Sequence, residues 1–302
     1  MNELTIYILC HNRPDDAKHA IDSVMKQRDR KFSLVVSDNS SNDEVGRMVK
    51  THFPDIGYVR RLPMLPALDH FNRCIEENKT EYFCLFHDDD LMGSEFVEVI
   101  KQSINKFPSA IAFACNAHIE MHGKLAPRPS FRSYRNHEFI STSRDLATRY
   151  FARAQSGIAP FPSYVYNSRI IGDQRIPIDG GKYADVTWLL GLVSKAPIVW
   201  INKALMTYRM HESNDGSIES MRDRLRFLRY LKQHKKEVGL DVLEDYRCSF
   251  IYKKISKAND RSHLKRHKFA LSFLKKYRLS RYTRLGTYRV LLSRALIKIK
   301  TK

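Results

Sequence analysis

The sequence lacks long apolar runs and glycine-rich nucleotide motifs. No apolar run in the 302 residues approaches the roughly 20 needed to cross a bilayer. The first residues also lack the charged leader, apolar stretch and cleavage site of a secretory signal, so we expect a protein kept in the cytoplasm. Neither GxxxxGK[ST] nor GxGxxG occurs, so nucleoside triphosphate hydrolysis and dinucleotide oxidoreduction are poorly supported.

Cysteine is scarce and unpaired in the sequence. The five cysteines are an odd number with no close pair, which indicates neither a disulfide framework nor a thiolate zinc site. Three of them lie in strand-like apolar runs, where a reduced thiol packs as a small apolar side chain. We therefore assign the thiols no reaction chemistry.

Acidic residues are rare in the last part of the chain. Residues 1–221 hold 27 Lys+Arg and 27 Asp+Glu, whereas residues 222–302 hold 25 and 6, so the net charge of +19 lies entirely in the latter. Such one-sided charge favours an anionic partner, namely a membrane, a nucleic acid or a phosphate-bearing substrate. The alternative is a solvated helical surface that only keeps the protein soluble.

The first part of the chain alternates short apolar runs with helical spacing. The runs are predicted strands, and they lie at residues 4–10, 32–38, 57–63 and 81–86. The predicted helices between them cover residues 15–27, 44–52 and 67–79. This order predicts an α/β fold, a mostly parallel sheet with helices on both faces. Ligands of such sheets bind beyond the carboxyl ends of the strands.

The rest of the chain is less regular and then strongly helical. A strand and turn are expected at 111–124, a loop-rich, substrate-facing region at 125–163, further strands at 163–167 and 198–211, and a helix at 185–196. Long helical patterns begin at residue 220, for example at 221–239 and 287–300. We predict a catalytic domain over residues 1–215 and a basic α-helical region over 216–302.

Polar clusters follow three of the predicted strands. They read HNR at 11–13, SDNSS at 37–41 and HDDD at 87–90. Because parallel strands end at one edge of the sheet, we expect the three clusters to meet there.

The three consecutive aspartates, Asp88, Asp89 and Asp90, require compensation. Two unit charges about 4 Å apart repel by roughly 1 kcal/mol in water and by roughly 4 kcal/mol near a protein surface. Asp88 and Asp90 share a face if the segment is extended, and Asp89 opposes them unless the chain turns. Carboxylates in this pattern suit Mg²⁺ or Mn²⁺. The alternative is a solvated turn or helix cap, which needs only one aspartate.

Two further acids stand where a helix is about to begin. Asp38 ends a predicted strand and could cap the next helix or accept hydrogen bonds from a nucleoside. Asp185 follows Gly180 and Gly181 and could likewise cap a helix or act as a general base in a cleft.

Four separated motifs together resemble the family 2 glycosyltransferases, which have the GT-A fold. They are TIYILCHNRPDDAKHAIDSV, LVVSDNSSND, NRCIEENKTEYFCLFHDDD and GGKYADVTWLLGLVSKAPIVWINKALMTYRMHESN. The resemblance covers roughly the first 215 residues in the family's order. It implies a GT-A, Rossmann-like nucleotide-sugar-binding domain, a divalent cation at the diphosphate and transfer with inversion at the anomeric carbon.

The resemblance also implies roles for individual residues. The nucleotide pocket would be formed by Cys10, His11, Arg13, Asp38, Asn72 and Asp88. The metal would be bound by Asp88, Asp89, Asp90 and His211, with the choice between Asp89 and Asp90 as the direct ligand left open. His87 stands where many members carry the first aspartate. Asp185 matches the catalytic base, with Ala184 and Trp188 where the family commonly has a second acid or an aromatic.

These observations predict an inverting, metal-dependent glycosyltransferase. The resemblance implies a nucleotide-sugar donor, and we expect its nucleotide to be uridine diphosphate. The implied acceptor is a glycan or glycolipid of lipopolysaccharide, O-antigen or capsule synthesis. The basic residues 222–302 would contact the anionic inner face of the cytoplasmic membrane or the phosphates of the acceptor. Two alternatives are a nucleic-acid-binding protein with a basic helical arm, which we do not expect, and a catalytically inactive protein that only binds sugar nucleotides.

Overall fold

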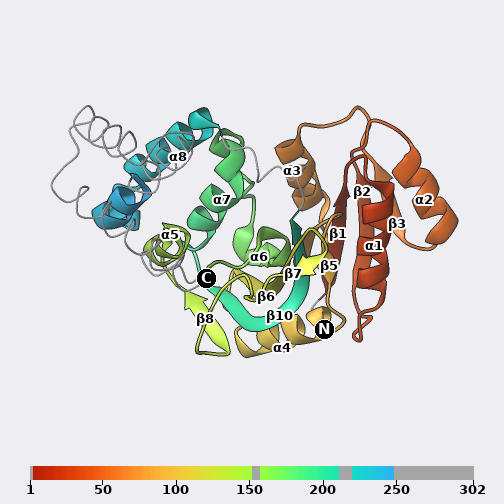
Figure 1. Ribbon diagram of the computed structural model, residues 1–302, viewed down its shortest axis with the longest axis horizontal. Helices are drawn as coiled ribbons and strands as arrows, with labels where there is room; N and C mark the ends of the chain where they lie inside the picture. The colour runs from red at the N-terminus through yellow and green to blue at the C-terminus, as the bar shows by residue number, and fades with distance from the viewer. Residues whose placement is uncertain (1–2, 152–156, 211–219, 248–302) are drawn as a thin grey trace, which may run out of the picture. The chain divides into compact units, whose positions relative to one another are not determined.

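The computed structural model describes residues 3–151, 157–210 and 220–247 (Figure 1). The described residues form two compact units, one of residues 3–142 with 157–210 and one of residues 143–151 with 220–247. The predicted domain boundary at 215–216 falls outside the described residues and stays a prediction. No described helix is long and apolar enough to cross a membrane.

The first unit is built on one mixed sheet. Across the described residues its strands run in the order β3-β2-β1-β4-β9-β6-β10-β5, with β7 beside β6 and β8 beside β10. The strands with parallel pairing are β1 (Leu4–Cys10), β2 (Ser33–Asp38), β3 (Gly57–Arg60), β4 (Tyr82–His87), β6 (Ala112–Met121) and β10 (Ile198–Met210). The predicted α/β fold with a mostly parallel sheet is therefore confirmed.

Four short strands run antiparallel to their neighbours. They are β5 (Leu91–Met92), β7 (Lys124–Leu125), β8 (His137–Ile140) and β9 (Val165–Asn167). Strand β9 lies between β4 and β6 and joins the two parallel halves of the sheet. Strand β8, which the sequence did not predict, lies inside the region expected to be loop-rich.

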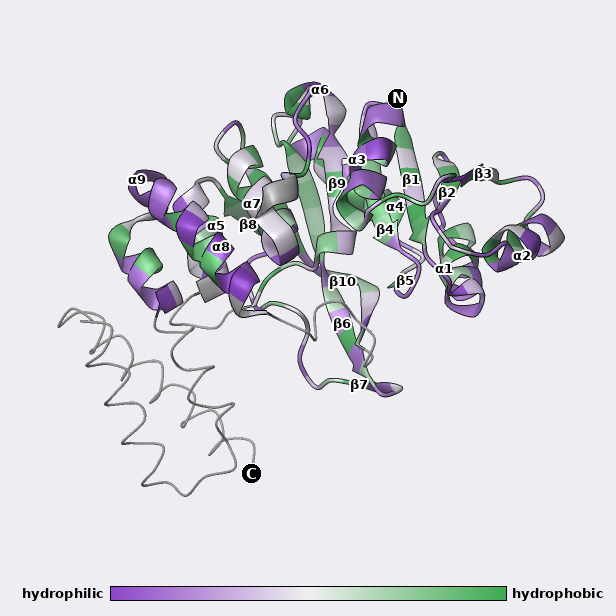
Figure 2. Cartoon of the chain, turned by 90° about the horizontal axis from the view of Figure 1, so that it is seen from above, coloured by the Kyte–Doolittle hydropathy of each residue, from purple (hydrophilic) through white to green (hydrophobic). Residues whose placement is uncertain are grey.

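Alternation along the strands places the main core on one face of the sheet. Ile6, Ile8 and Cys10 of β1 are buried in this core together with residues of α1 (Pro14–Met25), α2 (Glu44–His52) and α4 (Phe96–Lys106). Burying a large aliphatic side chain contributes about 1.5–3 kcal/mol. Figure 2 shows much of the central sheet in green, the colour of hydrophobic residues, and many residues of these strands are buried.

The opposite face of the sheet carries a buried polar network beneath α3 (Ala67–Glu77). The Ser37 hydroxyl lies 2.8 Å from Nε2 of His70 and accepts from Nε of Arg61 at 2.9 Å. The Arg61 guanidinium, only 6 % exposed, donates to both carboxylate oxygens of Glu77. Burial and then the Arg61 charge lower the pKa of His70 to about 4, so this ring is neutral at pH 7. The network fixes α3 over the strand ends.

Two short helical segments and α7 follow β9 in the first unit. They are α6 (Ser168–Ile171), the 3-10 turn η2 (Ile178–Tyr183) and α7 (Ala184–Leu192), with the 3-10 turn η1 (Phe161–Ser163) just before β9. Gly181 has φ 59° and ψ −131°, a conformation that favours glycine, at the point where the chain enters α7. Gly181 therefore permits the backbone kink that lies four residues before Asp185.

The second unit is helical in its described residues. It contains α5 (Ser143–Phe151), α8 (Met221–Gln233) and α9 (Lys235–Val238). Arg144 of α5 donates to both carboxylate oxygens of Asp241 at 2.7 Å, and Phe227 of α8 is fully buried. The long helix predicted at 221–239 is divided at His234, and the helix predicted at 287–300 lies outside the described residues. Helix α5 was not expected from the sequence.

Candidate active site

The polar clusters after β1, β2 and β4 do meet at one edge of the sheet. Asn12 adopts φ 56°, a left-handed conformation that asparagine tolerates, and its main-chain nitrogen donates to Oγ of Ser40 at 2.8 Å. Its side-chain oxygen accepts from the main-chain nitrogen of Ser41 at 2.8 Å. His11 Nδ1 lies 2.9 Å from the carbonyl oxygen of Asn39. These contacts join the loops after β1 and β2 into one surface.

Asp38 is fully buried, and both of its carboxylate oxygens are engaged inside the protein. Oδ2 accepts from Tyr58 at 2.7 Å and from Arg60, while Oδ1 accepts from the main-chain nitrogen and the hydroxyl of Ser40. Arg60 also donates to the Ser40 carbonyl at 2.7 Å. The carboxylate therefore organises Tyr58 and Arg60, two residues that the sequence reasoning did not single out. Contact between Asp38 and a nucleoside stays a prediction.

Arg13 provides the positive charge that the aspartates require. Its guanidinium donates to Oδ1 of Asp88 at 2.5 Å and to Oδ2 of Asp89 at 2.8 Å. The main-chain nitrogen of His11 donates to the other oxygen of Asp88 at 3.0 Å. The pKa of Asp88 is raised to about 6, because the effect of burial is larger than the opposing effect of the Arg13 charge. The Arg13 side chain, which is one-third exposed, therefore pairs with the carboxyl groups of both Asp88 and Asp89.

Arg209 holds the same turn from the end of β10. Its main-chain nitrogen donates to Oδ1 of Asp90 at 2.9 Å, and its Nε donates to the Asp89 carbonyl at 2.5 Å. Its guanidinium also pairs with Asp16 of α1 at 3.1 Å. Arg209 therefore connects the aspartate turn to two other elements of the first unit.

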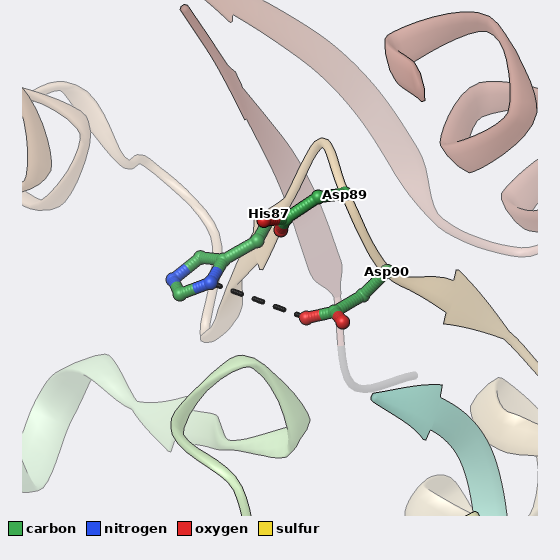
Figure 3. Close-up of side chains that lie close together, drawn as sticks. All are labelled: His87, Asp89 and Asp90. Carbon is green, nitrogen blue, oxygen red and sulfur yellow. Dashed lines mark ion pairs between the residues drawn. The ribbon is translucent and has the colours of Figure 1, made fainter. Parts of the chain in front are cut away.

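His87, Asp89 and Asp90 form a group with the composition of a metal site (Figure 3). Each offers one ligand atom, and these atoms lie within 4.8 Å of one another. Asp90 is fully buried, and among the described residues its Oδ2 has no hydrogen-bond partner, although it lies 4.0 Å from Nδ1 of His87. Burial and then the Asp89 charge raise the pKa of Asp90 well above its usual value. A buried carboxylate oxygen without a hydrogen-bond partner is suited to bind a cation.

The group differs from the predicted metal set in two respects. The chain turns at residues 88 and 89, so the alternation that would bring Asp88 beside Asp90 does not apply. Asp88 instead has both oxygens held by Arg13 and by the main chain of His11, and His87 takes its place in the group. His211 lies outside the described residues, so its role as a metal ligand stays a prediction.

Two residues predicted to form the nucleotide pocket are buried in the structure, and their contact with a nucleotide stays a prediction. The Cys10 thiol is completely buried in the core. Asn72 is 8 % exposed, and its amide makes reciprocal hydrogen bonds with the main chain of Ile176, at 2.8 and 3.0 Å. Asn72 thus tethers α3 to the segment that leads into η2 and α7.

Asp185 lies in the first turn of α7, as its sequence context suggested. Burial raises the pKa of Asp185 to about 6, while main-chain hydrogen bonds lower it. Trp188, one turn further along α7, has its ring centre 6.3 Å from that of Phe161, which in turn lies 6.1 Å from the ring of His87. A chain of aromatic contacts therefore connects the helix of Asp185 with the aspartate turn.

Comparison with known proteins identifies the family. The sequence model of the family described as Glycosyl transferase family 2 matches residues 5–159, just over half of the chain. The chain belongs to glycosyl transferase family 2. It is therefore a glycosyltransferase, as the four motifs predicted. No curated protein sequence gave a match.

Solved structures share the fold at low sequence identity. Among them is TarS from S. aureus, with 14 % identity and a TM-score of 0.56 over 83 % of this chain and 49 % of that one. This chain thus spans about half of that TarS chain. TarS 1-349 in complex with UDP-GlcNAc has 13 % identity and a TM-score of 0.55 over 82 % and 80 % of the two chains.

A third solved structure is that of a mannosyltransferase. The mannosyltransferase PcManGT from Pyrobaculum calidifontis, in complex with GDP-Man and Mn²⁺, has 14 % identity and a TM-score of 0.53 over 98 % of this chain and 86 % of that one. At these identities the likeness establishes the GT-A fold of the first unit and nothing finer.

Proposed function

We propose that this glycosyltransferase moves a sugar, with inversion, from a nucleotide sugar to a hydroxyl of a glycan or glycolipid, and that the transfer depends on a divalent ion. The observation that carries the proposal is the aspartate turn, where a buried Asp90 oxygen without a hydrogen-bond partner in the described residues faces His87 and Asp89. Uridine diphosphate is the first candidate nucleotide, supported by the UDP-GlcNAc complex of TarS 1-349. Guanosine diphosphate is the comparison, since PcManGT holds GDP-Man.

Asp185 is proposed as the general base. Its carboxylate takes the proton of the acceptor hydroxyl while that oxygen attacks the anomeric carbon and the bond to the nucleoside diphosphate breaks on the opposite side. A base works best when its pKa lies near the working pH, and burial brings the pKa of Asp185 to about 6. The carboxylate is then mostly ionised at pH 7, yet basic enough to accept a proton.

The leaving diphosphate is proposed to bind at the aspartate turn, with Mn²⁺ or Mg²⁺ held by Asp89 and Asp90. Such an ion supplies positive charge for the diphosphate as negative charge develops on it. Arg13 and Arg209 hold the two carboxylates in place, and His11 contributes its main chain to the same surface. The nucleoside would lie beside Tyr58 and Arg60, which Asp38 positions.

The test is to incubate the protein with a panel of nucleotide sugars and measure release of the nucleoside diphosphate. Asp185→Asn should bind the donor like wild type but lose transfer by at least about a hundredfold, the range for a lost general base. Asp173→Asn, the same change at an exposed aspartate before η2, serves as the matched control. Normal transfer by Asp185→Asn would remove it as base, and donor binding without turnover by wild type would favour an inactive sugar-nucleotide-binding protein.

The acceptor and the place of action are proposed from the basic C-terminal region. We propose a lipid-linked, lipopolysaccharide, O-antigen or capsule acceptor, met at the anionic inner face of the cytoplasmic membrane through residues 222–302. Support comes from the segment of α8 and α9, where exposed cations occur together with two exposed leucines, Leu225 in α8 and Leu240 just after α9. In Figure 2 hydrophilic and hydrophobic residues alternate along the ribbon of α8. The exposed cations are Arg222, Arg229, Lys232, Lys235 and Lys236.

Vesicle sedimentation tests the membrane contact. Each Lys or Arg near an anionic surface contributes about 1 kcal/mol, so Arg229→Glu with Lys232→Glu should weaken binding to phosphatidylglycerol vesicles at least about tenfold. Neutral phosphatidylcholine vesicles should bind neither protein. The matched control is Arg47→Glu with Lys50→Glu on the exposed side of α2. Equal binding by the α8 variant and wild type would contradict the proposal, whereas competition by nucleic acid would favour the other alternative.

A further inference from the structure

We propose that His87 is a direct ligand of the divalent ion, so that this site is a mixed imidazole and carboxylate site instead of an all-carboxylate one. The inference rests on the proposed function for the presence of the ion, but it concerns a residue that the family resemblance left without a role. It predicts a metal preference that a set of three aspartates would not have.

The position of the imidazole is the first support. His87 ends β4 and its Nδ1 lies 4.0 Å from Oδ2 of Asp90, with the Asp89 carboxylate in the same group (Figure 3). The two rings beside it, Phe71 edge-on at 5.8 Å and Phe161 at 6.1 Å, limit the directions that the imidazole can take. Its side chain is 29 % exposed, so the ring as a whole is not sealed in the core.

The state of Asp90 is the second and independent support. Its side chain is 1 % exposed, Oδ1 is held by the main chain of Arg209, and Oδ2 is directed at His87 without a hydrogen-bond partner among described residues. A buried acceptor in that state costs about 1–3 kcal/mol unless it gains a partner. A cation bound between Oδ2 and the imidazole would give the buried Asp90 oxygen the partner that it lacks among the described residues.

The loss of Asp88 from the group is the third support. Its two oxygens are taken by Arg13 and by the His11 main chain, so Asp88 neutralises the guanidinium and is not directed at the cluster. Removing one carboxylate and adding a neutral nitrogen lowers the negative charge of the ligand set. Hard ions such as Mg²⁺ prefer oxygen ligands, whereas imidazole suits later transition metals, so the exchange should favour Co²⁺ over Mg²⁺.

The direct experiment uses Mn²⁺ bound to the full-length protein without donor or acceptor. Pulsed electron paramagnetic resonance should show coupling of a ligand ¹⁴N nucleus to Mn²⁺ in wild type and in the transfer-deficient Asp185→Asn. The coupling should be lost in His87→Gln and in His87→Asp while Mn²⁺ stays bound. His211→Gln and His52→Gln should keep it, the first as the other candidate ligand and the second as an exposed control on α2.

A second experiment measures the preference of the site for Co²⁺ over Mg²⁺. The ratio of Mg²⁺ to Co²⁺ dissociation constants, measured by calorimetry and by Co²⁺ absorption, should fall at least about tenfold in His87→Asp. His87→Gln keeps the measurement available if the added acid prevents folding. A ¹⁴N coupling that survives in His87→Gln, or one that disappears only in His211→Gln, would overturn the proposal. So would an unchanged Mg²⁺ to Co²⁺ ratio, which would indicate that His87 is an ion-pair partner of Asp90. Because no sugar is present, these outcomes do not depend on whether transfer occurs.

Discussion

The main-chain nitrogen of Arg209 donates to Oδ1 of Asp90 at 2.9 Å, while the side chain of the same arginine reaches the Asp89 carbonyl and Asp16. One residue therefore holds a carboxylate oxygen, the main chain next to it and helix α1. The other Asp90 oxygen is left directed at His87. The orientation of the proposed metal ligand thus depends on a residue that is 119 positions away in the sequence.

Arg209→Ala should weaken binding of Mn²⁺ by about tenfold and lower the free energy of unfolding by about 1–3 kcal/mol, because the Asp89 carbonyl and Asp16 lose a charged donor. Calorimetry and urea unfolding measure the two quantities. Arg169→Ala, which removes an arginine that is 78 % exposed, is the control and should change neither. Unchanged Mn²⁺ affinity in Arg209→Ala would show that the turn keeps its geometry without the guanidinium.

Arg13→Met should destabilise the protein in a pH-dependent manner. At pH 7.5 the variant leaves the buried Asp88 and Asp89 carboxylates without their cation, and we expect a loss of about 2–4 kcal/mol. The loss should shrink toward pH 4.5, because burial raises the pKa of Asp88 to about 6 and the carboxyl becomes neutral below that pH. Urea unfolding at both pH values tests this. Arg28→Met, at a pair that is mostly exposed, should cost no more than about 1 kcal/mol, and an equal loss at both pH values for Arg13→Met would refute the explanation.

Asn72→Ala distinguishes a positioning role from a nucleotide contact. The change leaves the main-chain groups of Ile176, a residue only 2 % exposed, without partners, so we expect a loss of about 1–3 kcal/mol. Transfer should fall because the segment leading to Asp185 is released, while nucleotide affinity changes less than about threefold. Asn42→Ala on the exposed loop after β2 is the control. Lost nucleotide affinity with unchanged stability would instead support the contact predicted from the sequence.

Asp185→Asn should make the protein more stable above pH 6. Burial raises the pKa of the folded-state carboxyl to about 6, against about 3.9 in an unfolded chain. The folded state therefore binds the proton more tightly than the unfolded state, so ionisation of Asp185 lowers the free energy of unfolding. This loss of stability is absent below about pH 4, grows up to about pH 6 and is constant above that pH. We expect the variant to gain about 1–3 kcal/mol at pH 7.5 and almost nothing at pH 4.

Urea unfolding at pH 4, 5.5 and 7.5 measures this gain, and Asp173→Asn should show no such trend because that aspartate is exposed. A variant that is less stable than wild type at pH 7.5 would mean that the Asp185 carboxylate makes a stabilising contact. The expected gain in stability means that the wild-type protein is less stable because it keeps a buried carboxyl group with the raised pKa that a general base needs.

The parallel strands of the sheet and the helices between them could be predicted from the sequence, because the patterns that indicate them are local. Leu4–Cys10 and Glu44–His52 have the predicted bounds, since apolar alternation and helical spacing are properties of adjacent residues. Strand β9 enters between β4 and β6, and β8 pairs with β10. These short strands depend on partners far along the chain, and no local pattern reveals that pairing.

The sequence predicted where the site lies in the fold, but not which side chains contact one another there. Strand ends with polar residues correctly indicated one edge of the sheet. The turn at residues 88–89 decided that His87 and not Asp88 accompanies Asp90, and strand alternation carries no information about such a turn. Likewise, the sequence left Asp38 as either a helix cap or a nucleoside contact, and it did not show that Tyr58 and Arg60 from the next strand donate to one of its oxygens.

The central claim is that the strand-end surface binds a sugar nucleotide together with a divalent ion held by Asp90. Calorimetric titration of uridine diphosphate and guanosine diphosphate, with and without Mn²⁺, tests it on wild type and Asp90→Ala. We predict that one of the two nucleotides binds wild type only with Mn²⁺ and binds Asp90→Ala at least about tenfold more weakly, a difference of about 1.4 kcal/mol. Binding that is the same without Mn²⁺ and in Asp90→Ala, or no binding of either nucleotide to folded wild-type protein, would contradict the claim.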